Sequence, residues 1–305
     1  MRYVFVIFLL YSVLSVWAQV GTFFGVTIQN DFLNYRGHGT DRYYTGGHQA
    51  SLLFCNSRRV FSHHQVSVTQ QLYTPDNLQD TSVRYSDYPY AGLLYATYRI
   101  QHRMLTSKTR LSVSASCGYS GKRSGARQAQ QFLHRAIGDE IPQGWDHIVQ
   151  NGPFVQFELV LGQPLVAVSV ATAMLCQSIE VGSLFQRVRW GLSVLVGAAA
   201  MPLGSFTLFT EQRQTNKKYG VGFFVTPTIT RVFKNRLLQG SLQLGSHYQR
   251  VLHQQLAGLE FGLQLRLKRT KVHFTQYLLE REFEQVSPHA FGELGVIFPL
   301  FQRIQ

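Results

Sequence analysis

The feature that most constrains this chain is a period-two alternation of apolar and polar residues. It is clearest where one face of a segment carries Ala257, Leu259, Phe261, Leu263, Leu265 and Leu267. The opposite face carries Gly258, Glu260, Gly262, Gln264, Arg266 and Lys268. This period is typical of a β-strand whose two faces meet different surroundings. We expect the leucine face to contact lipid and the charged face to line the lumen of a barrel, because a sandwich core would not accept those charges.

The same alternation predicts an all-β fold with about twelve strands. Charged residues make up only 15% of the chain, against about 25% in a typical soluble domain. Beyond the N-terminus, no run reaches the roughly 18 apolar residues that a membrane helix requires. A transmembrane antiparallel β-barrel accounts for both observations, since its strands satisfy one another's backbone groups. The predicted strands cover residues 22–30, 46–55, 64–73, 90–101, 108–119, 154–161, 164–178, 186–199, 219–233, 257–268, 271–283 and 289–299.

One segment departs from the strand pattern. Residues 126–137 read as a short helix, and Gly138 is a suitable C-terminal cap. This helix falls in the longest predicted connection, about residues 120–151. Long loops on a rigid scaffold often carry function.

The N-terminus has the features of a cleaved signal peptide over residues 1–18. Arg2 precedes an apolar stretch, and Val16-Trp17-Ala18 suits the small-residue cleavage rule. We therefore expect an exported protein whose residues 19–305 form a single barrel domain in the outer membrane of a Gram-negative bacterium. Three cysteines without ligand spacing indicate neither a disulfide framework nor a metal site.

The formal net charge of +13 suggests an anionic partner. No lysine/arginine block or nucleic-acid-binding motif is present, so we do not expect a nucleic acid. On an exported barrel, basic residues meet the phosphates of lipopolysaccharide and other membrane lipids. We expect the barrel to be a monomer.

Two groups of residues are candidates for chemistry. Asn30 and Asp31 end the first predicted strand, and Thr45 begins the second, so their oxygen atoms could bind a hard cation. An Asn-Asp pair is also an ordinary way to start a turn. Gln130 and His134 share one face of the predicted helix.

Glu140 follows the break at Gly138 and could fold back to orient the imidazole of His134, which would then serve as a general base. A surface histidine on a loop helix is the alternative. The chain lacks a Gly-x-Ser-x-Gly motif, which argues against an esterase with a serine nucleophile.

The order of several short motifs resembles the lipid A 3′-O-deacylase family of outer-membrane enzymes. The similarity is dense over residues 24–155 and returns near the C-terminus, at Glu282-Phe283-Glu284-Gln285 and His289-Ala290-Phe291-Gly292. The motifs of the dense part are Asn30-Asp31, Thr40-Asp41-Arg42-Tyr43-Tyr44-Thr45-Gly46, Tyr73-Thr74-Pro75, Asp87-Tyr88-Pro89-Tyr90-Ala91-Gly92, Gln130-x-x-x-His134 and Pro142-Gln143-Gly144-Trp145.

The resemblance implies a twelve-stranded barrel that removes 3′-linked acyl chains from lipid A with the help of calcium. It implies an active site inside the barrel, near the outer leaflet. The family's essential positions correspond to Asn30, Asp31, Thr45, His134 and Glu140. By this resemblance Asp31 and Asn30 would hold calcium, His134 oriented by Glu140 would be the base, and Asn30 and Thr45 would fix the metal, the water or the substrate.

Two departures from the family put its specificity in question. Tyr88 stands where the family usually has arginine. Asp80 stands nearest to the position of a family lysine that is proposed to hold the oxyanion, so that this role is unfilled or passes to another basic group such as Arg84. Two other functions stay open. One is a non-catalytic barrel, either a small channel or a scaffold, and the other is a calcium-dependent phospholipase barrel.

Overall fold

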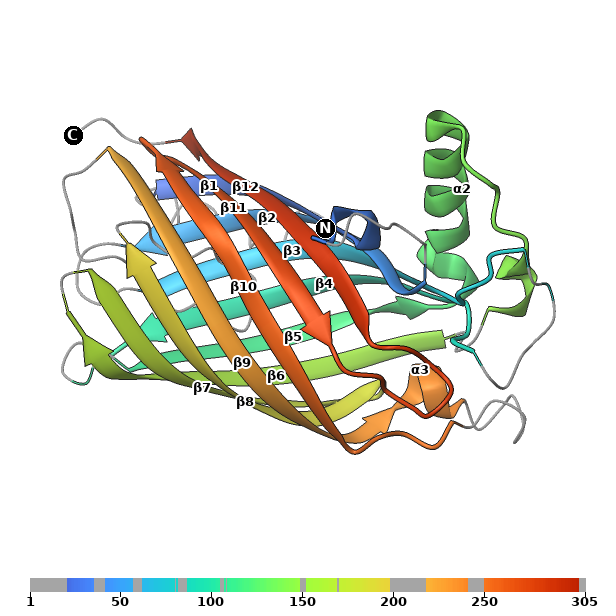
Figure 1. The fold of residues 1–305 in the computed structure, drawn as a ribbon. Helices are drawn as coiled ribbons and strands as arrows, with labels where there is room; N and C mark the ends of the chain where they lie inside the picture. Colours follow the sequence, from blue (N-terminus) through green and yellow to red (C-terminus); the bar gives the residue numbers. More distant parts are fainter. Residues whose placement is uncertain are drawn as a thin grey trace, which may run out of the picture.

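The chain folds into one closed antiparallel barrel of twelve strands (Figure 1). The structure is a computed structural model that describes residues 21–35, 42–56, 62–79, 81, 87–104, 107, 109–148, 152–168, 170–197, 218–240 and 250–301. The expected signal peptide lies outside these residues. Each strand pairs with its neighbours in sequence, and β1 pairs with β12 to close the barrel. The strands are β1 Gly21–Asn30, β2 Tyr43–Asn56, β3 Ser62–Thr74, β4 Ala91–Arg103, β5 Arg110–Ser120, β6 Gly152–Ala167, β7 Ala171–Gly182, β8 Phe185–Gly197, β9 Tyr219–Asn235, β10 Gln255–Leu267, β11 Thr270–Leu279 and β12 His289–Phe301.

The prediction that one face of β10 lines the lumen and the other faces outward is confirmed. Glu260 and Gln264 are buried in the lumen, with 3% and 1% of their surfaces exposed, whereas Leu267 on the opposite face is 48% exposed. The same contrast runs around the barrel, where small polar residues point inward and aliphatic or aromatic residues point outward. None of the helices in the described part of the chain is long and apolar enough to cross a membrane.

One strand boundary was predicted wrongly. The sequence suggested a break near Pro164, but β6 continues through this proline to Ala167 and β7 begins at Ala171. Proline lacks the N–H that a strand ladder uses. The register between β6 and β7 shifts between Pro164 and Val166, and an irregularity of this kind accommodates the missing donor.

The predicted helix is confirmed as α2, Ala126–Ile137. Gly138 ends it with a left-handed conformation, φ 74°, and its backbone N–H donates to the carbonyl of His134. Figure 1 shows that α2 projects sideways from one end of the barrel, here called the α2 end. Five connections, residues 31–42, 75–90, 121–151, 236–254 and 280–288, join strands at this end. β1 begins and β12 ends at the other end, where residues 198–218 join β8 to β9.

Side chains from these connections pack at the α2 end of the lumen and line part of its cavity. They form a buried aromatic and aliphatic cluster with the start of β2, and Arg250 from the 236–254 connection donates to the backbone carbonyl of Asp87 at 2.8 Å. We call this cluster and Arg250 the lid. The buried members of the cluster are Tyr43, Tyr88, Leu238, Phe283 and Val286.

Candidate active site on the outer wall

Asn30 lies on the outer face of the barrel wall. Side chains alternate along β1, so Asn30 shares its face with Val26 and Ile28, which are 38% and 43% exposed, while Thr27 and Gln29 line the lumen. The expectation of a site inside the barrel is therefore wrong for this residue. The alternation of side chains along β1 determines on which face Asn30 lies, and the position of Asn30 at the end of the strand does not.

A short helix, η1 (Asp31–Leu33), folds from Asn30 onto the outside of the neighbouring strands. The Asn30 Oδ1 caps it by accepting a hydrogen bond from the Phe32 N–H at 2.7 Å. Gln276 of β11, whose position faces outward, donates to the carbonyl of Leu33 at 2.7 Å and accepts from the Tyr35 N–H at 2.7 Å. Gly292 of β12 leaves the space that this crossing needs, because a Cβ there would collide with the Leu33 carbonyl.

The Asp31 carboxylate is held inside this crossing. Asp31 is only 2% exposed, and its Oδ2 accepts a hydrogen bond from the Arg42 backbone N–H at 2.9 Å. The Arg42 side chain in turn contacts the Asp76 carboxylate at 3.4 Å. The carboxylate is thus fixed next to Asn30 by the chain that returns into β2.

Thr45 lies beside Asn30 on the same wall. Gly46 pairs with Asn30 across β1 and β2, and the register of β2 shifts between Tyr44 and Gly46, so Thr45 is the extra residue of a bulge. Its hydroxyl is 2.5 Å from the hydroxyl of Thr74 in β3, and both threonines are buried. Thr74 lies an even number of residues along β3 from the outward-facing Val66 and Val68, so it is on the same face of the strand. The bulge turns Thr45 towards this outer face.

The base of α2 packs on the outer face of β3 and β4. Gln70 of β3 donates to the carbonyl of Ser124, just before the helix, at 2.8 Å. Ala126 packs with Leu72, and a Cβ on Gly92 would collide with the side chain of Ala126. Asn30, Gly46, Leu72 and Gly92 are successive register partners across β1 to β4. The helix therefore meets the wall about 14 Å from Asn30, which is three strand spacings.

His134 is oriented by the backbone carbonyl of Glu140, and the Asp139 carboxylate, 3.8 Å from the same ring nitrogen, lies beyond hydrogen-bond distance. His134 is 3% exposed, and its Nδ1 lies 2.5 Å from the backbone carbonyl oxygen of Glu140. The Glu140 carboxylate accepts a hydrogen bond from Gln79 at 3.2 Å instead. The reason is the left-handed Gly138, which turns the chain back so that the carbonyl of Glu140 reaches the ring. An accepting carbonyl requires hydrogen on Nδ1, which leaves Nε2 as the basic nitrogen.

Gln130 connects α2 to the segment that follows the helix through a side-chain hydrogen bond. Its Oε1 accepts a hydrogen bond from the Trp145 indole N–H at 2.7 Å. Trp145 is 1% exposed and packs against Tyr90, with ring centroids 4.9 Å apart. The motif residues Gln130 and Trp145 therefore serve to hold His134 in place.

Tyr88, which replaces the family's arginine, belongs to the lid. Its hydroxyl donates to the Glu282 carboxylate at 3.0 Å, and Asn235 donates to the other oxygen of that carboxylate at 3.2 Å. Burial raises the pKa of Glu282, while Tyr88, Arg187 and Asn235 oppose this shift. Burial also raises the pKa of Tyr88, so it stays a neutral hydrogen-bond donor. Asp80 and Arg84 lie outside the described residues.

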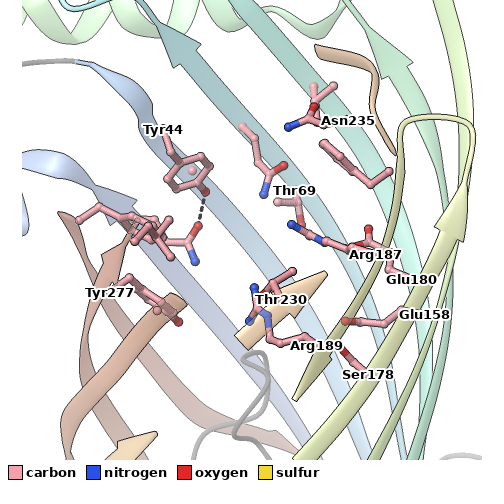
Figure 2. A pocket seen from close by; sticks show the side chains of 18 of the residues that line it. Tyr44, Thr69, Glu158, Ser178, Glu180, Arg187, Arg189, Thr230, Asn235 and Tyr277 are labelled. Atoms are coloured by element: carbon pink, nitrogen blue, oxygen red, sulfur yellow. Dashed lines mark hydrogen bonds and ion pairs between the residues drawn. The ribbon is translucent and has the colours of Figure 1, made fainter. Parts of the chain in front are cut away.

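The sequence reasoning missed a second polar region, in the lumen. Four acid–base pairs face a cavity of about 410 Å³ there, and Figure 2 shows Glu158, Glu180, Arg187 and Arg189 together on one side of it, across from Tyr44 and Tyr277. The strand pattern indicates which residues face inward, but pairing across strands depends on the register. The pairs are Arg99–Glu158 at 3.1 Å, Arg187–Glu180 at 2.5 Å, Arg189–Glu260 at 3.0 Å and His273–Glu293 at 2.8 Å.

The oxygen atoms at and next to Asn30 are of the kind that bind a hard cation. They are the carboxylate of Asp31, the amide of Asn30 and the hydroxyl of Thr45, and oxygen ligands of this kind suit calcium. Within the described ranges, no group of three or more His, Cys, Asp or Glu side chains is placed to hold a metal ion. A cation here would thus rest on one carboxylate together with neutral oxygen atoms.

Comparisons with known proteins agree with the barrel. The family model described as Outer membrane protein LpxR matches residues 4–300. LpxR from Salmonella typhimurium has a similar structure, with a TM-score of 0.78 and 16% sequence identity over 90% of this chain and 99% of that one. The β domain of the Bordetella autotransporter BrkA gives a TM-score of 0.48 at 10% identity, over 92% of this chain and 100% of that one. No curated protein sequence matches the chain.

Proposed function

The chain belongs to the family of Outer membrane protein LpxR, and on that premise we propose that it removes 3′-linked acyl chains from lipid A by calcium-assisted ester hydrolysis. An outer-membrane barrel carries most of its long loops on the cell exterior. Five long connections, one of which contains α2, join strands at the α2 end, so we assign this end to the exterior. The substrate would be lipid A of the outer leaflet, and Asn30, Asp31, Thr45 and the start of α2 would lie at the level of that leaflet.

The observation that carries the proposal is that Asn30, Asp31 and Thr45 gather on the outer wall and that α2, the helix that carries His134, starts on the same face. A lipid A molecule in the outer leaflet reaches that wall by lateral diffusion, without entering the lumen. The lid packs at the α2 end of the lumen, on the route that a lipid would take to a lumenal site. Phosphate groups of lipid A would meet exposed basic side chains near α2, such as Arg135 and Lys122.

In the proposed reaction, His134 Nε2 removes a proton from water while the water oxygen attacks the ester carbonyl carbon. The Glu140 carbonyl holds the ring through Nδ1 and stabilises the imidazolium that forms. Breakage of the ester C–O bond releases a fatty acid, and the proton returns from His134 to the sugar oxygen, which becomes a hydroxyl. Calcium, when bound, would polarise the ester carbonyl. Asp31 and Asn30 would hold the ion, and Thr45 would position water or substrate.

Two other functions make different predictions. A small channel needs a continuous path through the lumen, and the packing of the lid at the α2 end disfavours it. A phospholipase would use the same groups on glycerophospholipids, and a scaffold would use none of them.

Mass spectrometry of lipid A from cells with and without the protein tests the proposal. The loss of one 3′-linked acyloxyacyl group from lipid A only in cells that carry the protein is the expected result. Intact lipid A with shortened glycerophospholipids would favour the phospholipase. If both lipids stay intact in the presence of calcium, the chain is a scaffold or a channel.

A further inference from the structure

The helix α2 is amphipathic, and its apolar side faces away from the rest of the protein. At about 100° per residue, its twelve residues separate into two continuous arcs. The apolar arc contains Ala126, Ala129, Phe132, Leu133, Ala136 and Ile137. The polar arc contains Arg127, Gln128, Gln130, Gln131, His134 and Arg135.

The protein buries Gln130 and His134 of the polar arc and leaves much of the apolar arc uncovered. Gln130 and His134 are each 3% exposed, because the segment 139–148 returns along this side of the helix. Phe132, Leu133 and Ile137 are 74%, 40% and 65% exposed. A helix of a soluble protein buries its apolar side against the rest of the protein. The apolar arc of α2 is not buried in this way, so an apolar environment outside the protein must cover it.

The position of α2 identifies that environment. The helix starts on the outer face of β3 and β4, which continues towards the lipid-exposed Val66 and Val68. Figure 1 shows α2 extending sideways from the barrel, with the returning segment on the side remote from the strands. The apolar arc therefore faces the layer in which the strands are embedded.

We infer that α2 is an interfacial helix that lies in the outer leaflet, with Phe132, Leu133 and Ile137 among the acyl chains. Lys122, Arg123 and Arg135 lie in the turn before the helix and on its polar arc, and their side chains suit the phosphate layer above those chains. This inference needs only the outer-membrane location and does not depend on the proposed hydrolysis. If the hydrolysis also holds, α2 keeps His134 at the depth of the lipid headgroups.

Spin labelling of the full-length barrel in vesicles of phosphatidylethanolamine and phosphatidylglycerol tests the inference. The native cysteines are replaced, and one nitroxide is attached at Phe132→Cys or Ile137→Cys. Gln128→Cys, on the exposed part of the polar arc, is the matched control, and Val68→Cys reports the lipid-facing wall. Heat-modifiable migration on a gel confirms that each variant is folded.

We expect labels at positions 132 and 137 to collide with oxygen several-fold more often, relative to a water-soluble nickel chelate, than the label at 128. Their ratios should approach that at position 68. Equal ratios at 132 and 128 would overturn the inference. Spin–spin broadening at 132 would also overturn it, because a second copy of the chain would then cover the apolar arc. Neither result depends on hydrolytic activity, so the proposed function is tested separately.

Discussion

The Nδ1 atom of His134 lies 2.5 Å from the backbone carbonyl oxygen of Glu140, and this contact determines which substitutions should affect the base. Glu140→Ala removes only the side chain, so most of the deacylase activity should remain. Gly138→Ala forces a left-handed conformation on alanine, at a cost of about 1–2 kcal/mol, and should displace the carbonyl. We expect it to lower kcat in a fatty-acid release assay. If Glu140→Ala lost more activity than Gly138→Ala, the carboxylate would be the orienting group after all.

If Asp31 holds calcium, its substitution should change the calcium dependence of activity more than substitution of another acidic residue does. Asp31→Asn keeps the size of the side chain but removes its charge, so activity should need more calcium or disappear. A chelator should abolish wild-type activity, and added calcium should restore it. Asp146→Asn, on an exposed carboxylate that pairs with Arg127, is the control and should leave the calcium titration unchanged. Full wild-type activity in excess chelator would exclude calcium assistance.

The two faces of β10 differ in their tolerance of charge. Leu263→Arg places a cation on the lipid-facing side near the middle of the strand and should cost about 2–4 kcal/mol of unfolding free energy. Urea unfolding in lipid vesicles measures this cost. Gln264→Arg, one residue further along, points into the lumen and controls for loss of packing. Equal costs for the two variants, together with lumenal labelling of position 263, would contradict the assigned faces.

Much of this architecture follows from local pattern. Alternation predicted all twelve strands, and Gly138 marked the end of α2 correctly. The face on which Asn30 lies follows from the alternation along β1, but the burial of Asp31 against the outer wall was not predicted, because it depends on how η1 crosses β12 and on the space at Gly292. The bulge at Thr45 and the lumenal pair His273–Glu293 depend on strand register, which the sequence of a single strand does not encode. The contact of the Glu140 carbonyl with His134 follows from a turn geometry that the residue types alone left open.

The buried carboxyl of Glu282 should make the lid sensitive to pH. Its folded-state pKa is raised by burial, so the folded state binds the proton more tightly than the unfolded state. Glu282 therefore stabilises the lid fully below its ordinary pKa, and this contribution is lost as the pH rises through the raised value. Hydrogen exchange near Tyr88 and Phe283 should become faster over that range. Glu282→Gln should flatten this dependence, and an unchanged pH profile in that variant would assign the effect to another group.

The central claim is that His134, in the helix α2 that starts on the outer wall, is the general base of a lipid A deacylase. The most direct measurement is the rate of fatty-acid release from purified lipid A by folded His134→Ala in the presence of calcium. His147→Ala, at an exposed histidine in the same loop, is the matched control. We predict that His134→Ala falls by about 10²–10⁴ relative to wild type and that His147→Ala stays close to wild type. An active wild type together with a fully active His134→Ala would contradict the account.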